Sequence, residues 1–264
     1  MNLSSIQEDV LDIITKAGSL LLTNFGQEHH ITKKADNTLV TDIDHLVSTY
    51  ITTKLQEKYP SFGLIDEEQN SNPLERDKEY CWVIDPLDST RDYIEGKEGF
   101  GIIIGLLHHG KVVLGMTNKP AKKEIATAIR GEGAFLYTNG KKTRIRVSTS
   151  TDIQLLLSRT RHNTISAQVL EKIKPSSITY MGGAIKIVEV ATGAASCYLC
   201  PPSSTLHLWD LCGTSLILQE AGGTITNWYG QPFDFQSMDF KNTQGVIATN
   251  GIIHERIIKI VQSL

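Results

Sequence analysis

Residues 81–91 read CWVIDPLDSTR. The first four are apolar and predict a buried strand that ends at Asp85, because the proline that follows has no N–H for a further ladder hydrogen bond. Asp88, Ser89 and Thr90 are typical of a helix start, where short polar side chains satisfy free backbone N–H groups. The stretch therefore predicts two carboxylates at the junction of a strand and a helix.

This junction suits a metal ion and a phosphate. Two carboxylates close together repel each other unless a cation lies between them, and oxygen-rich sites favour Mg²⁺ over metals that prefer softer ligands. The free N–H groups of Ser89 and Thr90 would suit phosphate oxygens. An isolated Asp-x-x-Asp is more often a strand end and a helix cap without a ligand, so the hypothesis depends on further acidic positions.

The composition is that of an ordinary globular protein. The chain has 264 residues, 40% hydrophobic and 21% charged, which suffices for one large domain or two halves packed together. The formal net charge of −3 offers no electrostatic basis for binding nucleic acid or an anionic membrane. An anionic substrate would therefore need a metal ion or particular lysine and arginine residues.

The cysteines and the N-terminus argue against several other classes. The four cysteines do not suggest a disulfide framework. Cys197 and Cys200 form a C-x-x-C, but a strand would place them on opposite faces, so neither a zinc site nor a redox motif is expected. Glu8, Asp9 and Asp12 make the N-terminus unlike a signal peptide, and no apolar run reaches the length of a membrane span. We expect a cytoplasmic protein.

Residues 1–150 are predicted to form an α+β half with an antiparallel sheet. Apolar residues at helical spacing predict an amphipathic helix over 3–25. A second helix is expected to begin at Thr41 or Asp42 and to run to about Tyr59, where a proline stops it.

Short β-rich runs supply the strands of this half. They lie at 99–107, 112–117, 125–129 and 134–137. The first two are joined by His108 and His109, which we interpret as part of a hairpin turn, with a ligand site as the less favoured alternative. The polar stretch that begins at Lys33 is expected to be a turn or loop, with Lys33 either near the entrance of a site or solvated.

Residues 151–264 change to strand–helix alternation and are predicted to form an α/β half. Strands are expected at 155–157, 178–180, 196–199, 224–228 and 245–248, and helices at 164–173, 184–192, 209–220 and from about 252. No internal repeat or low-complexity segment interrupts this pattern. The fold class expected for the whole chain is therefore α/β, with an α+β first half.

Further acidic positions follow the same rule as the first pair. Glu67 lies in an acidic triplet that follows the apolar strand at 62–65, and Asp210 lies at the start of a predicted helix. Each of Glu67, Asp85, Asp88 and Asp210 thus stands at a strand exit or a helix start. Such exits gather at one edge of a sheet, where ligands bind, so we expect these four residues in one site.

Three motifs together resemble a known family. Asp-Glu-Glu at 66–68, Trp-Val-Ile-Asp-Pro-Leu-Asp-Ser-Thr at 82–90 and Trp-Asp at 209–210 are similar to the signatures of the inositol monophosphatase superfamily. The resemblance covers nearly the whole chain in the right order. It implies a layered αβαβα sandwich and a Mg²⁺-dependent, lithium-sensitive phosphomonoesterase. Ser89 stands where the family usually has glycine, and we expect only a modest effect, because serine can occupy a helix N-terminus.

The resemblance also implies roles for individual residues. Two Mg²⁺ ions would be held by Glu67, Asp85, the backbone carbonyl of Leu87, Asp88 and Asp210. Asp44, in a Val-Thr-x-x-Asp motif, would assist a third ion and would act with Thr90 to position and deprotonate a metal-bound water. These roles agree with metal-ion catalysis in general, in which bound metal lowers the pKa of water and stabilises the leaving oxygen.

The C-terminal motifs resemble those of the 3'(2'),5'-bisphosphate nucleotidases. They are Ser158-Arg159-x-x-His162, Gly182-Gly183-Ala184-Ile185-Lys186 and Cys197-Tyr198-Leu199. The resemblance implies that the substrate is contacted by Leu87, Asp88, Ser89, Thr90, Ser158, Arg159, His162, Gly183, Lys186 and Asp210. The first loop has one residue more than the usual motif, which leaves open whether Arg161 or His162 takes the place of the histidine.

Two positions bear on the choice of substrate. Cys200 stands where some nucleotidases have an arginine, whereas Ser203 stands where inositol monophosphatases place a glutamate that contacts the ring hydroxyls. We expect hydrolysis of the 3'-phosphate of adenosine 3',5'-bisphosphate, with inositol phosphates or histidinol phosphate as alternatives. A metal-bound regulatory module without turnover is the non-enzyme alternative. The expected partner is a small phosphorylated molecule, not nucleic acid or membrane, and the chain is expected to be a monomer or a homodimer.

Overall fold

The computed structural model describes residues 2–34, 38–69, 72–159, 165–202 and 206–263. Within them the helices are α1 (Leu3–Asn24), α2 (Asp42–Lys58), η1 (Pro73–Asp77), α3 (Thr90–Ile94), η2 (Pro120–Lys122), α4 (Ala167–Ile173), α5 (Lys186–Ala191), α6 (Leu208–Glu220) and α7 (His254–Gln262). The strands are β1 (Ile31–Lys33), β2 (Leu39–Thr41), β3 (Gly63–Asp66), β4 (Tyr80–Asp88), β5 (Gly101–His108), β6 (Lys111–Lys119), β7 (Glu124–Ile129), β8 (Gly133–Thr138), β9 (Lys141–Arg144), β10 (Gln154–Ser158), β11 (Ser177–Met181), β12 (Cys197–Cys200), β13 (Leu206–His207), β14 (Thr224–Thr226), β15 (Lys241–Asn242) and β16 (Val246–Thr249).

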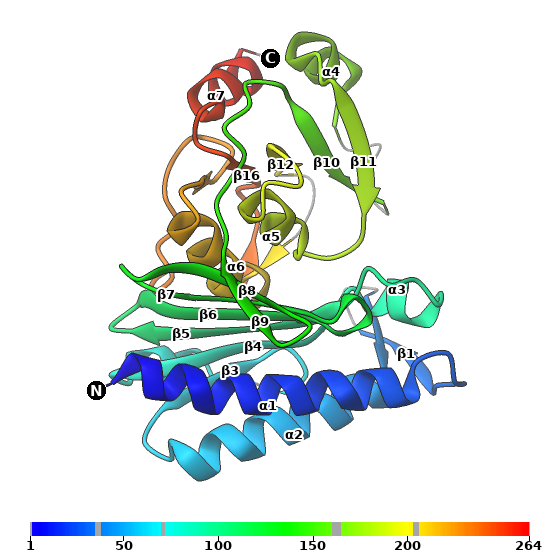
Figure 1. The fold of residues 1–264 in the computed structure, drawn as a ribbon, viewed down its shortest axis with the longest axis vertical. Helices are drawn as coiled ribbons and strands as arrows, with labels where there is room; N and C mark the ends of the chain where they lie inside the picture. The colour runs from blue at the N-terminus through cyan, green and yellow to red at the C-terminus, as the bar shows by residue number, and fades with distance from the viewer. Residues whose placement is uncertain (1, 35–37, 70–71, 160–164, 203–205, 264) are drawn as a thin grey trace.

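The elements stack in five layers (Figure 1). Helices α1 and α2 cover one face of a seven-stranded sheet, and α5 and α6 lie between its other face and a five-stranded sheet. Helices α4 and α7 cover the outer face of the second sheet. This arrangement confirms the expected αβαβα sandwich. It buries both faces of each sheet, which explains why so many strands are apolar along their whole length.

The large sheet is mostly antiparallel and has the strand order β3-β4-β5-β6-β7-β8-β9. Only its edge pair, β3 and β4, runs parallel. The small sheet has the order β11-β10-β12-β16-β14 and mixes parallel with antiparallel pairs. Helix α6 packs against β5 and β6 of the large sheet although it belongs to the C-terminal part of the chain. The division of the chain near residue 150 stays a prediction.

Local sequence explains where the first two helices begin. The Asn2 side chain accepts a hydrogen bond from the Ser4 N–H at 3.0 Å and caps α1. Thr41 caps α2 in a capping box with Asp44, whose carboxylate accepts the Thr41 N–H at 2.8 Å. The two helices lie within a residue or two of the predicted ranges. The capping box also holds Asp44 in a buried position next to the sheet.

Strand β4 is longer than the sequence predicted. It runs from Tyr80 through Pro86 to Asp88 instead of ending at Asp85. Its pairing with β5 shifts register between Asp85 and Asp88, and this irregularity accommodates a residue that has no N–H for the ladder. Asp88 therefore belongs to the strand and does not cap the helix that follows.

Helix α3 also begins differently from the prediction. Ser89 precedes it with φ +70° and ψ 51°, and its side chain makes no capping hydrogen bond. This left-handed conformation suits glycine, because an L side chain there approaches the backbone closely. Ser89 thus occupies the N-terminus of α3 as expected, but without the capping hydrogen bond that a helix start predicted. The expectation that it has only a modest effect stays a prediction.

Several other segments differ from the predicted ones. β1 pairs with β2, so Lys33 ends a short strand and does not lie in a loop. β9 was not predicted, because its polar and exposed side chains carry no apolar pattern. Helix α5 begins at Lys186 rather than at 184, and α4 begins at Ala167 rather than at 164. These shifts lie at helix starts, where sequence patterns locate boundaries poorly.

The four cysteines are all buried and free. Cys197 and Cys200 contribute to two different hydrophobic cores, because alternate faces of β12 meet different layers. Among the described residues, no helix combines the length and apolar character that crossing a bilayer would require.

Candidate active site

Three buried carboxylates meet where β4 ends and α6 begins. Asp85, Asp88 and Asp210 each offer an oxygen atom, and these atoms lie within 4.8 Å of one another. Asp85 and Asp88 come from the last part of β4, and Asp210 from the first turn of α6. The predicted gathering of these three residues at one sheet edge is therefore observed.

Backbone N–H groups orient each carboxylate. The Leu87 N–H donates to Asp85 Oδ1 at 3.0 Å, and the His207 N–H donates to Asp210 Oδ2. Asp88 accepts two N–H groups from the turn before α5, Ala184 at 2.8 Å and Ile185 at 2.9 Å. Each oxygen keeps a further lone pair. The cluster is thus preorganised by three separate segments of backbone.

Burial and mutual repulsion raise the pKa values of these carboxyl groups. Burial is the largest cause for Asp85, whose pKa lies well above its usual range, and the charges of Glu67 and Asp88 add to it. Burial and the charge of Asp210 raise the pKa of Asp88 to about 7. A divalent cation would relieve this repulsion. Carboxylate oxygens and the Leu87 carbonyl form a hard-oxygen donor set, so the residues present fit such an ion.

Glu67 lies beside the cluster and is paired with a lysine. Lys34 Nζ contacts Glu67 Oε1 at 2.8 Å and Glu68 Oε1 at 2.6 Å. Burial alone would lower the pKa of Lys34, but the two glutamates outweigh it and raise the pKa. Sequence reasoning named Lys33 and missed Lys34. Alternate residues of an extended segment point to opposite sides. The sequence alone therefore did not show whether Lys33 or Lys34 would point toward the site.

Asp44 and Thr90 are in direct contact. The Thr90 hydroxyl donates to Asp44 Oδ1 at 2.8 Å, and it also lies 3.2 Å from the Leu87 carbonyl oxygen. Asp44 Oδ2 accepts both the N–H and the hydroxyl of Thr41. Burial still raises the pKa of Asp44 above its usual value. The predicted pair is therefore brought together, and its catalytic role stays a prediction.

One cavity of about 340 Å³ collects most of the predicted site. Its lining includes the predicted residues Glu67, Asp85, Leu87, Asp88, Ser89, Thr90, Ser158, Gly183, Lys186 and Asp210. Arg91, Tyr198 and Trp209 line it as well. The sequence analysis did not name Arg91 as a site residue, because the motif that resembles the family ends at Thr90.

The Gly-rich turn approaches the acidic cluster closely. Gly183 has φ +64°, and a Cβ atom there would lie 2.2 Å from Asp88 Oδ2. Lys186 starts α5 with only 2% of its surface exposed. Its Nζ donates to the carbonyls of Met181, at 3.2 Å, and Gly183, and lies 5.1 Å from the centre of the Tyr198 ring. The turn thus places one buried cation at the cavity wall.

The loop after β10 is only partly placed in the site. Ser158 lines the cavity, whereas Arg159 pairs with Asp92, their Nη1 and Oδ1 atoms lying 2.6 Å apart. Sequence reasoning missed this pair, because Asp92 lies on α3, far away in the chain. His162 lies outside the described residues, as do Arg161 and Ser203, so the alternatives at these positions stay predictions.

Comparison with known proteins identifies the family. The model of the inositol monophosphatase family matches residues 2–264. The chain belongs to this family. It is 27% identical to a fructose-1,6-bisphosphatase/inositol-1-monophosphatase of Thermotoga maritima, over 96% of this chain and 94% of that protein. It is also 27% identical to the 3'(2'),5'-bisphosphate nucleotidase CysQ of Buchnera aphidicola, over 84% of each chain.

A solved structure agrees with this assignment. The extragenic suppressor protein SuhB of Bartonella henselae superposes with a TM-score of 0.85 at 26% identity, over 98% of both chains. The sequence-based recognition of the superfamily is therefore confirmed, and the protein is a phosphatase of this family. Because proteins with different names match at similar identity, the family alone does not identify the substrate.

Proposed function

We propose that the protein is a Mg²⁺-dependent phosphomonoesterase that removes the 3'-phosphate of adenosine 3',5'-bisphosphate. The observation that carries the proposal is that one cavity is lined both by the acidic cluster and by Lys186. An enzyme of this kind needs a cation site next to the phosphate that it removes. To bind a bisphosphate, it also needs a second positive group that contacts the phosphate that remains.

The acidic residues would hold the metal ions. Asp85, Asp88, Asp210 and the Leu87 carbonyl would be the ligands, with Glu67 released from Lys34 to join them. Mg²⁺ supplies charge stabilisation and lowers the pKa of bound water.

The residues around the cluster would handle the proton and the phosphate. The Thr90 hydroxyl donates a hydrogen bond to Asp44, and its oxygen would in turn accept a proton from a water molecule in the cavity. Lys186 and the Gly-rich turn would hold the second phosphate. The similarity to the CysQ nucleotidase supports this arrangement.

An inositol monophosphate is the second candidate, and one contact favours it. The guanidinium of Arg159 is paired with Asp92, and Arg159 does not belong to the residues that line the cavity. Within the described part of the loop after β10, Arg159 therefore adds no positive charge to the cavity lining. The Thermotoga relative, named an inositol-1-monophosphatase as well as a fructose-1,6-bisphosphatase, is consistent with this alternative.

The test is phosphate release from adenosine 3',5'-bisphosphate and from inositol 1-phosphate, with Mg²⁺, with and without lithium. We expect preference for the nucleotide, loss of activity with lithium, and a Lys186→Ala variant whose KM rises more for the bisphosphate than for inositol 1-phosphate. Preference for inositol 1-phosphate would overturn the substrate assignment while keeping the phosphatase. Equal losses on both substrates would remove Lys186 from the second-phosphate site.

A further inference from the structure

A second group of metal-ligating side chains lies at the far end of the large sheet. Glu79 precedes β4, and His108 and His109 lie at the turn between β5 and β6. The acidic cluster lies toward the opposite end of β4, where Asp85 and Asp88 are six and nine residues from Glu79, which corresponds to roughly 20 and 30 Å of extended strand. The two groups are therefore separate sites.

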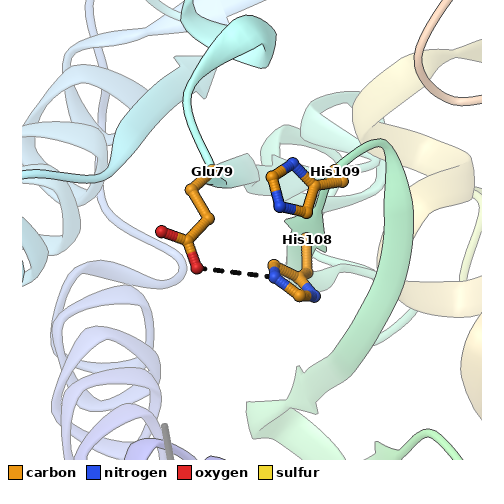
Figure 2. Close-up of side chains that lie close together, drawn as sticks. All are labelled: Glu79, His108 and His109. Atoms are coloured by element: carbon orange, nitrogen blue, oxygen red, sulfur yellow. Dashed lines mark ion pairs between the residues drawn. The ribbon is translucent and has the colours of Figure 1, made fainter.

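The three side chains face one another (Figure 2). Glu79 Oε1 lies 3.6 Å from His108 Nε2, and the rings of His108 and His109 have their centres 4.6 Å apart. One possible ligand atom from each residue lies within 4.8 Å of the other two. In a tetrahedral zinc site with bonds of about 2.0–2.1 Å, ligand atoms lie roughly 3.3 Å apart. Small side-chain rotations would therefore bring all three onto one ion.

The backbone holds the three residues in place. The His109 N–H donates to the Glu79 carbonyl at 2.9 Å, and His108 pairs with Tyr80 across the β4–β5 ladder. The turn also contacts a distant loop, because a Cβ atom at Gly110 would lie 2.5 Å from Gln236 Oε1. The backbone positions of the three residues are thus fixed by the sheet, whereas the side chains of Glu79 and His109 are exposed.

Aromatic stacking restricts the His108 ring. It lies 4.4 Å from the Tyr80 ring, with an angle of 14° between their planes. Tyr80 in turn stacks on Phe62 at 4.8 Å and 16°, and Phe62 is buried in the core beneath α2. A ligand ring that is oriented before the metal arrives loses less conformational freedom when it binds.

We propose that Glu79, His108 and His109 form a surface site for a late first-row divalent metal ion, with Zn²⁺ as the ligand to test. Two imidazoles and one carboxylate match the ligand preference of zinc, whereas Mg²⁺ prefers an all-oxygen shell. Three protein ligands leave a fourth position for water. The bound ion would connect the segment before β4 to the β5–β6 turn. Because it would bind the folded chain in preference to the unfolded chain, it would raise the free energy of unfolding.

The test is calorimetric titration of the full chain with Zn²⁺ in the presence of excess Mg²⁺. We expect one zinc equivalent, with the affinity lowered roughly tenfold or more by His109→Asn and, independently, by Glu79→Gln. Asparagine tolerates the left-handed backbone of residue 109, whose φ is +47°, so this variant keeps the turn. Neither variant should change phosphate release, because both positions lie at the opposite end of the sheet.

Two further variants distinguish zinc binding at this site from zinc binding at another histidine or at the acidic cluster. His30→Gln removes an exposed histidine elsewhere and should leave zinc binding unchanged. Asp210→Asn alters the acidic cluster and should also retain the zinc equivalent. Wild-type affinity in both His109→Asn and Glu79→Gln would overturn the proposal. Loss of zinc binding in Asp210→Asn alone would assign the ion to the acidic cluster instead.

Discussion

At the scale of single residues, the candidate site depends on a few close contacts. Asp88 illustrates this, because its two oxygens accept N–H groups from the Gly-rich turn while a Cβ atom at Gly183 would contact the same carboxylate. Ser89 lies next to it in a left-handed conformation. A charged carboxylate at Asp88 and a strained backbone at Ser89 are thus neighbours, and separate substitutions can test turnover and stability.

Ser89→Gly should stabilise the protein. Glycine adopts φ +70° without the contact between Cβ and the backbone that costs an L residue about 1–2 kcal/mol, although it loses more backbone entropy on folding. We expect the free energy of unfolding in urea to rise by up to about 1 kcal/mol. Ser89→Ala is the matched control, because it removes the hydroxyl but keeps the strain. Equal stabilisation by alanine would show that backbone strain is not the cause.

Asp210→Asn should lower phosphate release at least about a hundredfold, even at saturating Mg²⁺, because the proposed metal site loses one charged ligand. The Asn amide can still accept the His207 N–H, so the helix start should be kept. Asp12→Asn, on the exposed face of α1, provides a control for changes in net charge. A rate within threefold of wild type would remove Asp210 from the proposed ligands.

At the scale of elements, the distance between α6 and the large sheet decides where Asp210 lies. This helix sits so close to the large sheet that a Cβ atom at Gly213 would lie 2.6 Å from the Ile104 carbonyl oxygen. A Cβ atom at Gly115 would lie 2.3 Å from the Gly213 carbonyl oxygen. Glycines on both sides of this contact allow α6 to pack closely against the sheet. This close packing places Asp210 near the end of β4.

Gly213→Ala should therefore destabilise the protein and impair the site together. Overpacking of this kind typically costs 1–3 kcal/mol, and we expect about 2 kcal/mol in urea unfolding. Turnover should fall as well, because α6 would move with Asp210. Gln219→Ala, on the exposed face of the same helix, should change neither quantity appreciably. Unchanged turnover in a destabilised Gly213→Ala variant would show that the helix does not set the position of the carboxylate.

At the scale of the whole molecule, α5 is joined to the large sheet by buried charges. Glu189 on α5 contacts Lys119 at the end of β6, with Oε1 and Nζ 3.0 Å apart, and also contacts Lys122 at 3.2 Å. Burial would raise the pKa of Glu189, but the two lysines outweigh it and the pKa is lowered from its usual value near 4.5. The ion pair thereby connects the layer that carries Lys186 to the layer that carries the acidic cluster.

This ion pair gives a prediction about pH. Because the folded-state pKa of Glu189 is depressed, its contribution is present above the unfolded value near pH 4.5 and is lost as pH falls through the folded value. Glu189→Gln should be less stable than wild type by roughly 2 kcal/mol at pH 7, and the difference should shrink below pH 4.5. Urea unfolding between pH 7 and pH 3 measures it, with exposed Glu171→Gln as control. A difference independent of pH would contradict the ionic origin.

Most of the elements and the core of the site could be predicted from the sequence. The apolar spacing of α1, the capping box of α2 and the acidic residues at the ends of β3 and β4 are local signals, each within a few positions of one another. The left-handed Ser89 could not be predicted in this way. A serine there is equally compatible with an ordinary helix start until the bulge in β4 is known.

The sequence by itself determined the fold class, the family and the acidic residues, because short motifs and apolar periodicity record local geometry directly. Only the tertiary structure decided which charges meet. Lys34 pairs with Glu67, Arg159 with Asp92 and Glu79 with His108, across separations of about thirty residues or more. Such contacts depend on how layers stack and how strands register, and no local pattern in the chain encodes them.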